Sequence, residues 1–507
     1  MSDNSLFPEC SNLNDKKINI SNNIFGRRFH KDQTLYEYLI EFLLIFVSSK
    51  EENSEQGKFE FHDAELSKME YYADPRMGLK RFIFYDKSKK TDSIPQDKDA
   101  YEALRNRLLT QIVYDGADTN TKEEVINCLQ DFLYGYPVVI KNRSWCAQGM
   151  LPICPELIFC EAMPAKKKRL ANVKWTSMPE TVDTLFDFTK HNFLARGGEL
   201  YYLHLVQGLK GKVEDKRKLE FYLKDLLTSQ SAKVSTISNF IQNTWYKEIN
   251  SDELSLRQTC TIGCIPQNGY IPCENKTIQE LLYFLSNKLP LVRKLELFAQ
   301  GIILQIMRMM TTRLSTYLEI NQKPWIVDMG CPGNRIIKVM ASNSFHEIEN
   351  DFTTALNKEL ENYKDLNKGE KYTYFLEGKK ESLAIFRAKG KDIKCIIPLK
   401  GGFERFSLSE DIVTFLVLSL IRPGTQMTLD MFLDAIYKNY NIVIGINEYT
   451  KSVSEQTDLK SVSISFNKNV ASFEKFLKAT GFLQELSDAT SVVVNPYEEI
   501  VFNGDAK

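Results

Sequence analysis

The chain has 507 residues, of which 43% are hydrophobic and 26% charged, values near the globular average that exclude a mostly disordered, collagen-like or fibrous protein. At roughly 150 residues per domain, this length predicts about three domains. The 65 Lys and Arg residues balance 66 Asp and Glu residues to a net charge of -1, so any surface for nucleic acid or an acidic membrane must be local.

Cysteine content and hydropathy indicate a cytoplasmic protein without a membrane partner. Ten Cys are too sparse for a disulfide scaffold, and the start MSDNSLFPEC has neither the basic nor the apolar region of a signal peptide. The most apolar stretches, residues 39–47 and 412–421, are shorter than the ~20 residues that span a bilayer. We interpret both as buried core helices.

Residues 1–24 are rich in Asn, Ser and Asp, a composition that predicts a flexible tail. A mixed α/β N-terminal domain is expected over residues 25–165. It begins with a capping box, Thr34-x-x-Glu37, that opens an apolar helix.

Later in this domain, residues 81–85 (RFIFY) are β-prone and a polar, turn-rich segment follows them, which predicts a strand or hairpin edge. Two helices are expected at 101–113 and 122–133. Residues 141–164 hold three Pro and three Cys and predict a structured loop.

A helical domain is predicted for residues 166–368. Its helical pattern starts with the capping box Ser177-x-x-Glu180 and continues with the helices that apolar spacing indicates. These helices are expected at 218–228, 234–246, 278–287 and 291–320. No repeat of fixed period supports a solenoid.

Residues 369–405 predict a small antiparallel β insertion. Three β-prone runs, at 372–376, 383–387 and 393–397, are separated by Gly-Lys turn signals at Gly378 and Gly390. The expected fold class is therefore mainly α with smaller β elements, an α+β multidomain chain.

The last hundred residues, 406–507, contain three predicted helices and a hairpin. Ser407-x-x-Glu410 caps a first helix, Thr428 begins a second, and a third at 472–479 ends before FLQELSDATSVVV, two β-prone arms around a turn. This order resembles the winged-helix superfamily over about the last fifth of the chain. The resemblance implies a helix in the major groove and a wing on the DNA backbone.

The recognition helix of such a unit could be 428–440, which carries only Lys438, or 472–479 with Lys475 and Lys478. The wing loop holds Asp488 and no basic residue, unlike the DNA-binding pattern. Nucleic-acid contact and a protein–protein role therefore both stay open.

Three local basic clusters are further candidates for nucleic-acid contact. The middle cluster interleaves with Phe82, Phe84 and Tyr85, and such mixtures can follow a single-stranded backbone and stack its bases. The alternative is an ordinary strand that buries its aromatic side chains and leaves its lysines exposed to solvent. With the C-terminal lysines, the candidates are Arg27, Arg28, Lys80, Arg81, Lys87, Lys89, Lys90, Lys166, Lys167, Lys168, Arg169, Lys475 and Lys478.

Two cysteine triplets raise the question of zinc. Only Cys260-x3-Cys264 has the spacing of a zinc knuckle, and no second pair or nearby His accompanies it. We therefore expect buried thiols and no metal site. The triplets are Cys146, Cys154 and Cys160, and Cys260, Cys264 and Cys273.

Residues 325–333 (WIVDMGCPG) resemble the strand and Gly-rich turn with which Rossmann-like methyltransferases receive S-adenosylmethionine. Pro332 departs from that pattern, and no alternating series of strands surrounds the segment. A tight turn between helical layers is the preferred interpretation, so no cofactor is predicted.

The function that we expect is that of a non-enzymatic scaffold or adaptor subunit in a prokaryotic nucleic-acid-processing or phage-defence assembly. Other protein subunits are the expected partners, and DNA binding is a further hypothesis. No complete catalytic motif occurs, so we predict no catalytic residue. The alternative is a divergent enzyme, either a transferase around Asp328 to Gly333 or a metal-dependent nuclease with Asp74, Asp86 and Glu102 near Lys87.

Overall fold

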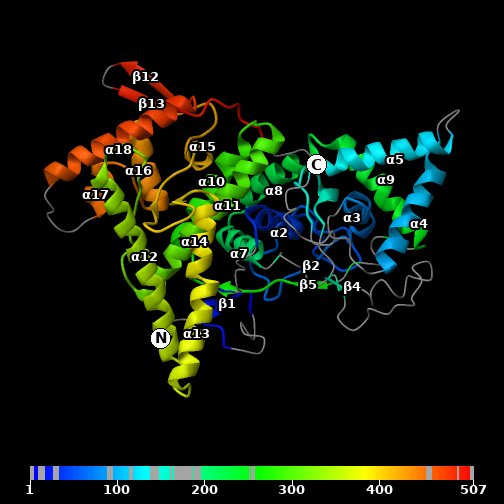
Figure 1. Ribbon diagram of the computed structural model, residues 1–507, viewed down its shortest axis with the longest axis horizontal. Coiled ribbons are helices and arrows are strands. Elements are labelled where there is room, and N and C mark those ends of the chain that lie inside the picture. The colour runs from blue at the N-terminus through cyan, green and yellow to red at the C-terminus, as the bar shows by residue number, and fades with distance from the viewer. Residues whose placement is uncertain are drawn as a thin grey trace.

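The computed structural model describes most of the chain (Figure 1). The described residues are 5–9, 18–26, 33–87, 95–113, 118–136, 148–159, 163–164, 186–187, 194, 196–250, 252, 257, 259–452, 459–487 and 490–502.

Helices make up 61% of the structure and the strands are short, so the predicted fold class, mainly α with smaller β elements, is confirmed. The helices are α1 (Ile20–Phe25), α2 (Leu35–Val47), α3 (Met77–Phe84), α4 (Pro95–Gln111), α5 (Thr119–Tyr134), α7 (Gly197–Gly208), α8 (Val213–Thr228), α9 (Ala232–Glu248), α10 (Ile271–Ser286), α11 (Leu291–Leu318), α12 (Arg335–Glu361), α13 (Lys368–Glu381), α14 (Leu383–Asp392), α15 (Glu410–Leu420), α16 (Leu429–Tyr440), α17 (Ile446–Ser452) and α18 (Leu459–Ala479), with a single 3-10 turn, η2 (Pro155–Leu157), among the described residues.

The strands pair mostly in twos. They are β1 (Leu6–Phe7), β2 (Glu70–Tyr72), β3 (Met163–Pro164), β4 (Phe186–Asp187), β5 (Thr259–Thr261), β6 (Ile265–Pro266), β7 (Trp325–Ile326), β8 (Ile396–Ile397), β9 (Arg405–Phe406), β10 (Gln426–Thr428), β11 (Ile442–Val443), β12 (Leu483–Ser487) and β13 (Thr490–Val494). The described strands form one three-stranded antiparallel sheet in the order β10-β13-β12, and β7 pairs in parallel with β11.

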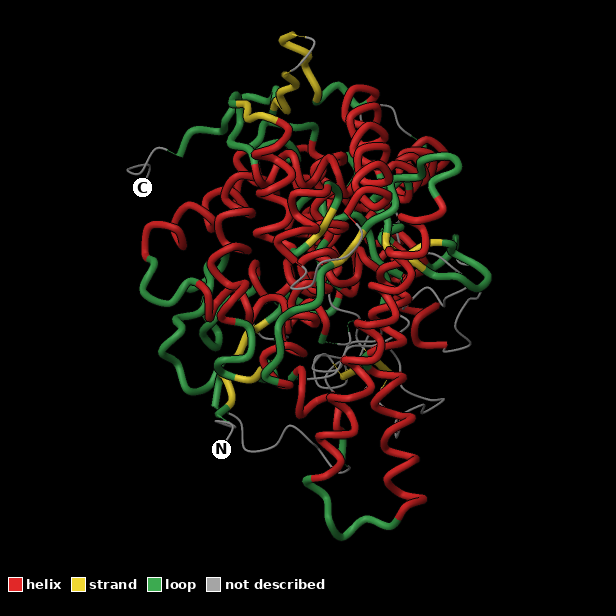
Figure 2. Tube along the Cα trace, turned by 90° about the vertical axis from the view of Figure 1, so that its left-hand side faces the viewer, coloured by secondary structure: helices red, strands yellow, loops and turns green. Residues whose placement is uncertain are grey.

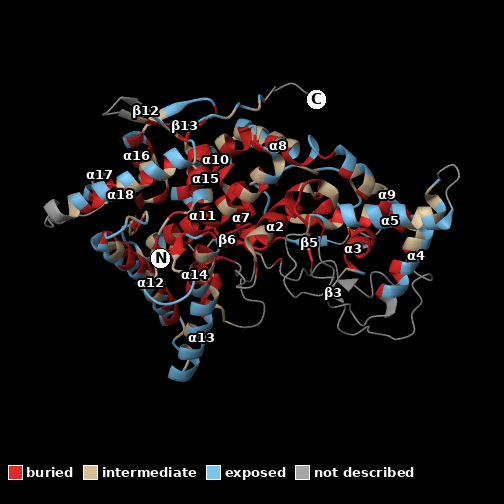
Figure 3. Cartoon of the chain, turned by 45° about the horizontal axis from the view of Figure 1, so that its top comes forward, coloured by how far each residue is buried: buried red, intermediate tan, exposed pale blue. Residues whose placement is uncertain are grey.

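The core is built around α11, whose buried residues lie on all sides of the helix, as expected for a central helix. The helices α2, α10 and α15 pack on it, and α7 packs on α2 and α10 (Figure 3). Gly301 of α11 lies against the ring of Phe415, where an added Cβ would come within 2.1 Å of Cε2. One cluster of buried side chains extends from Phe7 to Val493 and includes residues on both sides of every predicted domain boundary, so the division into domains stays a prediction.

Two parts of the molecule extend from this body (Figures 1 and 2). The far ends of α12 and α13, joined by residues 362–367, lie side by side at one end, and the β12–β13 hairpin lies at the opposite end above α18. None of the helices in the described part of the chain combines the length and the apolar character that a membrane span needs.

Several helices were predicted correctly, α2 most completely. Thr34 and Glu37 form the capping box, with Glu37 N donating to Thr34 Oγ1 and Thr34 N to the Glu37 carboxylate. The four helices expected between 218 and 320 are α8, α9, α10 and α11, and each ends within two residues of the prediction. The helices α8 and α10 begin five and seven residues earlier than predicted. The expected start at Ser177 lies outside the described residues.

The predicted strand at residues 81–85 is wrong, because residues 81–84 form the last turn of α3 and Tyr85 is its C-cap. A short apolar run cannot be assigned to strand or helix by its pattern alone. Here Leu79, Phe82 and Ile83 follow helical spacing and are all buried, and Gly78 packs directly on Trp245 of α9. Packing against α9 therefore decides the conformation.

The predicted β insertion at 369–405 is also wrong, since α13 and α14 occupy most of it. A capping box between Asn367 and Glu370 starts α13. The glycines interpreted as turns instead allow close helix packing: Gly378 lies against Ile20 and Leu356, and Gly390 against Ile396. The only strands in this segment are β8 and β9, of two residues each.

Two smaller differences concern helix starts and the N-terminus. Ser409, not Ser407, caps α15.

Part of the predicted flexible tail is structured, because Ile20 and Ile24 of α1 are buried among α11, α12 and α13 and β1 pairs with β6. Those distant contacts supply the stabilisation that the local composition lacks.

Candidate nucleic-acid interface

The C-terminal helices and strands form a small unit around one sheet. In chain order these elements are α15, β10, α16, α18, β12 and β13, most of which are labelled in Figure 1. In the sheet, β13 lies between β10 and β12. Two short elements, β11 and α17, are inserted between α16 and α18. The insertion places β11 beside β7 and thereby joins this unit to the rest of the body.

The outer face of α18 carries a row of exposed residues at helical spacing. Asn467, Lys468, Ala471, Lys475 and Lys478 lie on this face, which we call the α18 lysine face. Lys468 and Lys475 form no ion pair with another described residue, whereas the ammonium of Lys478 lies 2.9 Å from the Glu485 carboxylate on β12. Two of the three lysines are therefore free to meet a phosphate.

The opposite face of α18 fixes this row in place. Phe473 is fully buried and stacks on Phe432 of α16, with ring centroids 6.3 Å apart. Leu477, one turn later, is fully buried as well. A rigid helix with its lysines outside loses little conformational freedom on binding, other than that of the lysine side chains.

The first half of α18 is held by a buried amide. Asn469 donates from Nδ2 to the carbonyls of Val327 and Ile444, both at 3.0 Å, and its Oδ1 accepts from Met329 N at 2.9 Å. One side chain thus connects α18 with the segments that follow β7 and β11.

Asp328, the residue of the cofactor hypothesis, is fully buried and already bound. Oδ1 accepts from Gly330 N, and Oδ2 accepts from Arg405 Nε, each at 2.9 Å. Gly330 and Gly333 adopt positive φ with open space around them, so each meets a conformational need of the turn. This geometry favours the tight-turn interpretation, because both oxygens that a ribose would need have protein partners.

Two predicted contact residues lie inside the protein. Arg81 is 1% exposed and paired with Asp97, and Lys80 is 5% exposed with its ammonium 5.5 Å from the centre of the Phe159 ring. Both residues point inward because α3 replaces the predicted strand. In this conformation neither side chain can reach a surface-bound nucleic acid.

Lys87 is partly exposed and forms an ion pair with Asp131 of α5, so its charge is locally balanced. Lys475 and Lys478 are exposed on α18. The other candidates lie outside the described residues: Arg27, Arg28, Lys89, Lys90, Lys166, Lys167, Lys168 and Arg169.

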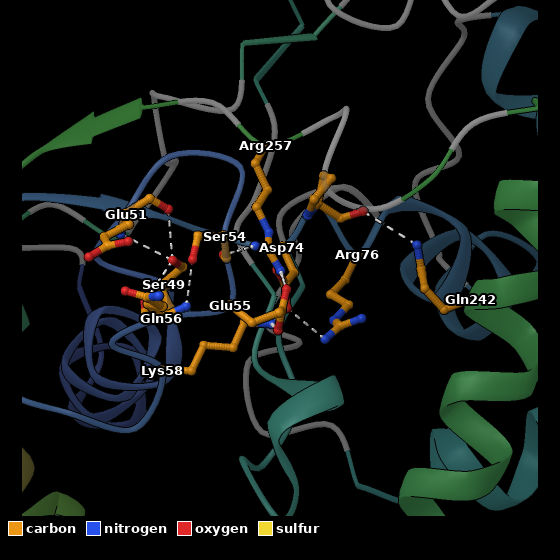
Figure 4. Close-up of polar contacts among 12 residues, drawn as sticks. Ser49, Glu51, Ser54, Glu55, Gln56, Lys58, Asp74, Arg76, Gln242 and Arg257 are labelled. Carbon is orange, nitrogen blue, oxygen red and sulfur yellow. Dashed lines mark hydrogen bonds and ion pairs between the residues drawn. The ribbon is translucent and has the colours of Figure 1, made fainter.

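The carboxylates of the nuclease hypothesis have separate partners. Asp74 accepts from three cations, Lys58 at 3.1 Å, Arg76 at 3.0 Å and Arg257 Nε at 2.7 Å (Figure 4). This network ties the segment around residues 49–58 to β2 and to Arg257. Three cations around one carboxylate leave no place for a divalent metal ion.

The other two acidic residues of that hypothesis lie apart from this network. Asp86 accepts from the hydroxyl of Tyr101, whose pKa is raised to about 12, first by burial and then by Asp86. Glu102 pairs with Lys98 on the surface of α4. Among the described residues, no group of three His, Cys, Asp or Glu side chains could hold a metal ion.

The cysteines in the described part of the triplets are buried thiols. Burial raises the pKa of Cys154 to about 12 and that of Cys273 to about 11, which disfavours the thiolate that zinc requires. Cys146 and Cys160 lie outside the described residues. Cys260 and Cys264 are buried too.

Sequence reasoning missed Lys468, Asn469 and Arg405. The third helix was predicted from residue 472, whereas α18 begins at Leu459. The predicted helix therefore included Lys475 and Lys478 but not Lys468. Lys468 lies seven residues, or two helical turns, before Lys475, so a longer predicted helix would have included it. No local signal marks Arg405, whose partner lies 77 positions away.

A comparison of the chain with protein-family models, curated proteins and solved structures finds no match.

Proposed function

We propose that the chain is a non-enzymatic, cytoplasmic nucleic-acid-binding subunit of a larger assembly, in which a winged-helix-like C-terminal unit binds a DNA duplex through α18. The order of helices and strands and the strand order β10-β13-β12 support the winged-helix assignment. The insertion of β11 and α17 departs from it.

The observation that carries the proposal is the α18 lysine face. Lys468, Lys475 and Lys478 lie at helical spacing on an exposed face, and the first two have no ion-pair partner among the described residues. A duplex carries one negative charge per ~1.7 Å of its axis, so unpaired lysines along a rigid helix complement it. Because the protein's net charge is only -1, a local surface such as this one has to provide the attraction.

A charge-reversal experiment tests this function. The double variant Lys468→Glu/Lys475→Glu should bind a 20-base-pair duplex about tenfold or more weakly in fluorescence anisotropy, and by a similar factor for unrelated sequences. The slope of log affinity against log salt should fall by about two. The matched control is Lys233→Glu/Lys247→Glu, which reverses two exposed α9 lysines that form no ion pair with a described residue.

Equal loss in both double variants would reduce the effect to net charge and contradict the assignment to α18. Unchanged affinity in the α18 variant would contradict it as well.

The scaffold role requires a separate experiment. Affinity purification from the native host at low salt, with and without nuclease, should recover protein subunits in fixed stoichiometry in both conditions. Partners from a phage-defence or nucleic-acid-processing system would identify the assembly. Recovery of the chain alone in both conditions would contradict the adaptor role.

A further inference from the structure

A second surface, at the β8–β9 hairpin, has the features of a site for single-stranded nucleic acid. The hairpin loop exposes an aromatic side chain, Phe403, which is 65% accessible. Its φ of 67° lies in the left-handed region, where glycine or asparagine is usual and a bulky residue is rare. Neither burial nor backbone preference therefore explains a phenylalanine at this position.

Arg405, two residues later, is fixed by a buried partner. Its Nε donates to Asp328 Oδ2 at 2.9 Å, and Asp328 is fully buried. Its two terminal amino groups form no hydrogen bond with a described residue, and the side chain is 19% exposed. Because its Nε is already held, the guanidinium has a fixed orientation, and its terminal nitrogens can donate hydrogen bonds to a phosphate oxygen.

The first turns of α12 add two more cations. Arg335, Lys338 and Ser342 share a helix face by their spacing, and Ser342 Oγ donates to the Glu404 carbonyl at 2.9 Å. This face therefore lies beside β9. Neither Arg335 nor Lys338 forms an ion pair with a described residue, and the carboxylate of Glu404 is already paired with Arg387 and Lys391.

We call Arg335, Lys338, Lys400, Phe403 and Arg405 the Phe403 patch. Lys400, in the same loop as Phe403, is exposed and forms no ion pair with a described residue. The patch thus combines one exposed aromatic ring with three cations that form no ion pair with a described residue, and with Arg405, whose charge is balanced by Asp328 but whose terminal nitrogens form no hydrogen bond with a described residue. Cations bind a phosphate backbone and the ring offers a stacking platform for a base. A duplex keeps its bases stacked inside, so this combination suits a single strand.

The patch lies within reach of the α18 lysine face. Asn334, at the start of α12, donates from Nδ2 to the Ser465 carbonyl of α18 at 2.8 Å. Lys475 is ten residues further along α18, or about 15 Å at 1.5 Å per residue. That length corresponds to about four base pairs at 3.4 Å each.

We propose that the Phe403 patch binds single-stranded nucleic acid next to a duplex held on α18, so that the chain recognises a junction between duplex and single strand. This inference rests on the proposed function for the duplex part. The single-strand part depends on Phe403 and its cations alone.

The test uses the full chain and three DNA probes in fluorescence anisotropy: a blunt 20-base-pair duplex, the same duplex with a ten-nucleotide oligo-dT tail, and oligo-dT of 20 nucleotides. The wild-type protein should bind the tailed duplex about tenfold more tightly than the blunt one. Phe403→Ala should remove this preference and leave binding to the blunt duplex unchanged. Phe403→Trp should keep the preference, because it preserves the stacking surface.

Leu399→Ala is the matched control, since Leu399 is an exposed apolar residue of the same loop without an aromatic ring. Its tail preference should equal that of the wild type. Arg335→Gln/Lys338→Gln should weaken binding of the tail and of oligo-dT about fivefold without changing blunt-duplex affinity.

The outcomes separate the two proposals. Equal wild-type affinity for blunt and tailed duplexes, or a tail preference that survives Phe403→Ala, overturns the single-strand inference and leaves the α18 proposal intact. Equal loss in Leu399→Ala and Phe403→Ala also overturns it, because stacking would then play no part. Failure of the wild-type protein to bind any probe overturns both proposals.

Discussion

The carboxylate of Glu280 on α10 and the guanidinium of Arg308 on α11 form an ion pair at 2.5 Å, and both side chains are only 2% exposed. The pair connects the central helices to the C-terminal unit, because the Tyr440 hydroxyl of α16 donates to Glu280 at 2.6 Å. The guanidinium also lies 4.3 Å from the centre of the Tyr440 ring. The C-terminal unit is therefore joined to the body by a buried polar contact as well as by apolar packing.

Removing one partner of this pair should strongly destabilise the protein. Glu280→Ala leaves the Arg308 charge buried and unpaired, for which a loss of about 3–5 kcal/mol is expected. Chemical denaturation followed by circular dichroism measures the change. The double variant Glu280→Leu/Arg308→Met removes both charges and should lose less than the single variant. An equal or larger loss in the double variant would contradict the ion-pair explanation.

The close contact between α11 and α15 should not tolerate a methyl group. Gly301→Ala places its Cβ against the ring of Phe415, and overpacking of this kind costs about 1–3 kcal/mol. Thermal unfolding of Gly301→Ala should show the loss, and the added change Phe415→Leu should restore part of it. Additive losses in the double variant would show that the two positions are not coupled.

The protein should lose stability in mild acid because of His62. Its Nδ1 lies 2.8 Å from the Tyr202 hydroxyl and its Nε2 lies 2.8 Å from the Glu70 carbonyl. Burial, and then the charge of Lys50, lower the pKa of His62 to about 4. A lowered pKa means that the folded state binds fewer protons than the unfolded state. This contribution to stability is therefore complete above pH ~6.5 and is lost as the pH falls towards 4.

Denaturant unfolding at pH 7.0 and pH 4.5 measures this effect, with an expected contribution from His62 of about 2 kcal/mol between these two pH values. His62→Gln should show a smaller difference between the two pH values. His346→Gln is the control, because His346 is an exposed residue on α12. The same pH difference in wild type and His62→Gln would contradict the role of this histidine.

The buried amide of Asn469 should control the order of the turn after β7. Asn469→Ala leaves the Val327 and Ile444 carbonyls and Met329 N without this partner, and a loss of about 1–3 kcal/mol is expected. Hydrogen exchange should increase in residues 327–330. The neighbouring exposed residue provides the control, since Asn467→Ala should change neither quantity. Unchanged exchange in Asn469→Ala would contradict the anchoring role.

The sequence alone was sufficient for helices that carry both a cap and a long apolar repeat. Thr34 and Glu37 mark the start of α2, and the spacing of Leu429, Phe432, Leu433 and Ile436 identifies α16. Over several turns, a repeat of 3.6 residues excludes other conformations.

Only the tertiary structure decided the short β-prone segments and the buried charges. Residues 81–84 are helical because α3 packs on α9. Residues 372–381 belong to α13, in which Gly378 lets Ile20 and Leu356 approach the helix. Asp328 received its partner Arg405 from 77 positions away. Local preferences of a few residues amount to tenths of a kcal/mol each, whereas burial against a distant segment contributes several, so such contacts outweigh the local pattern.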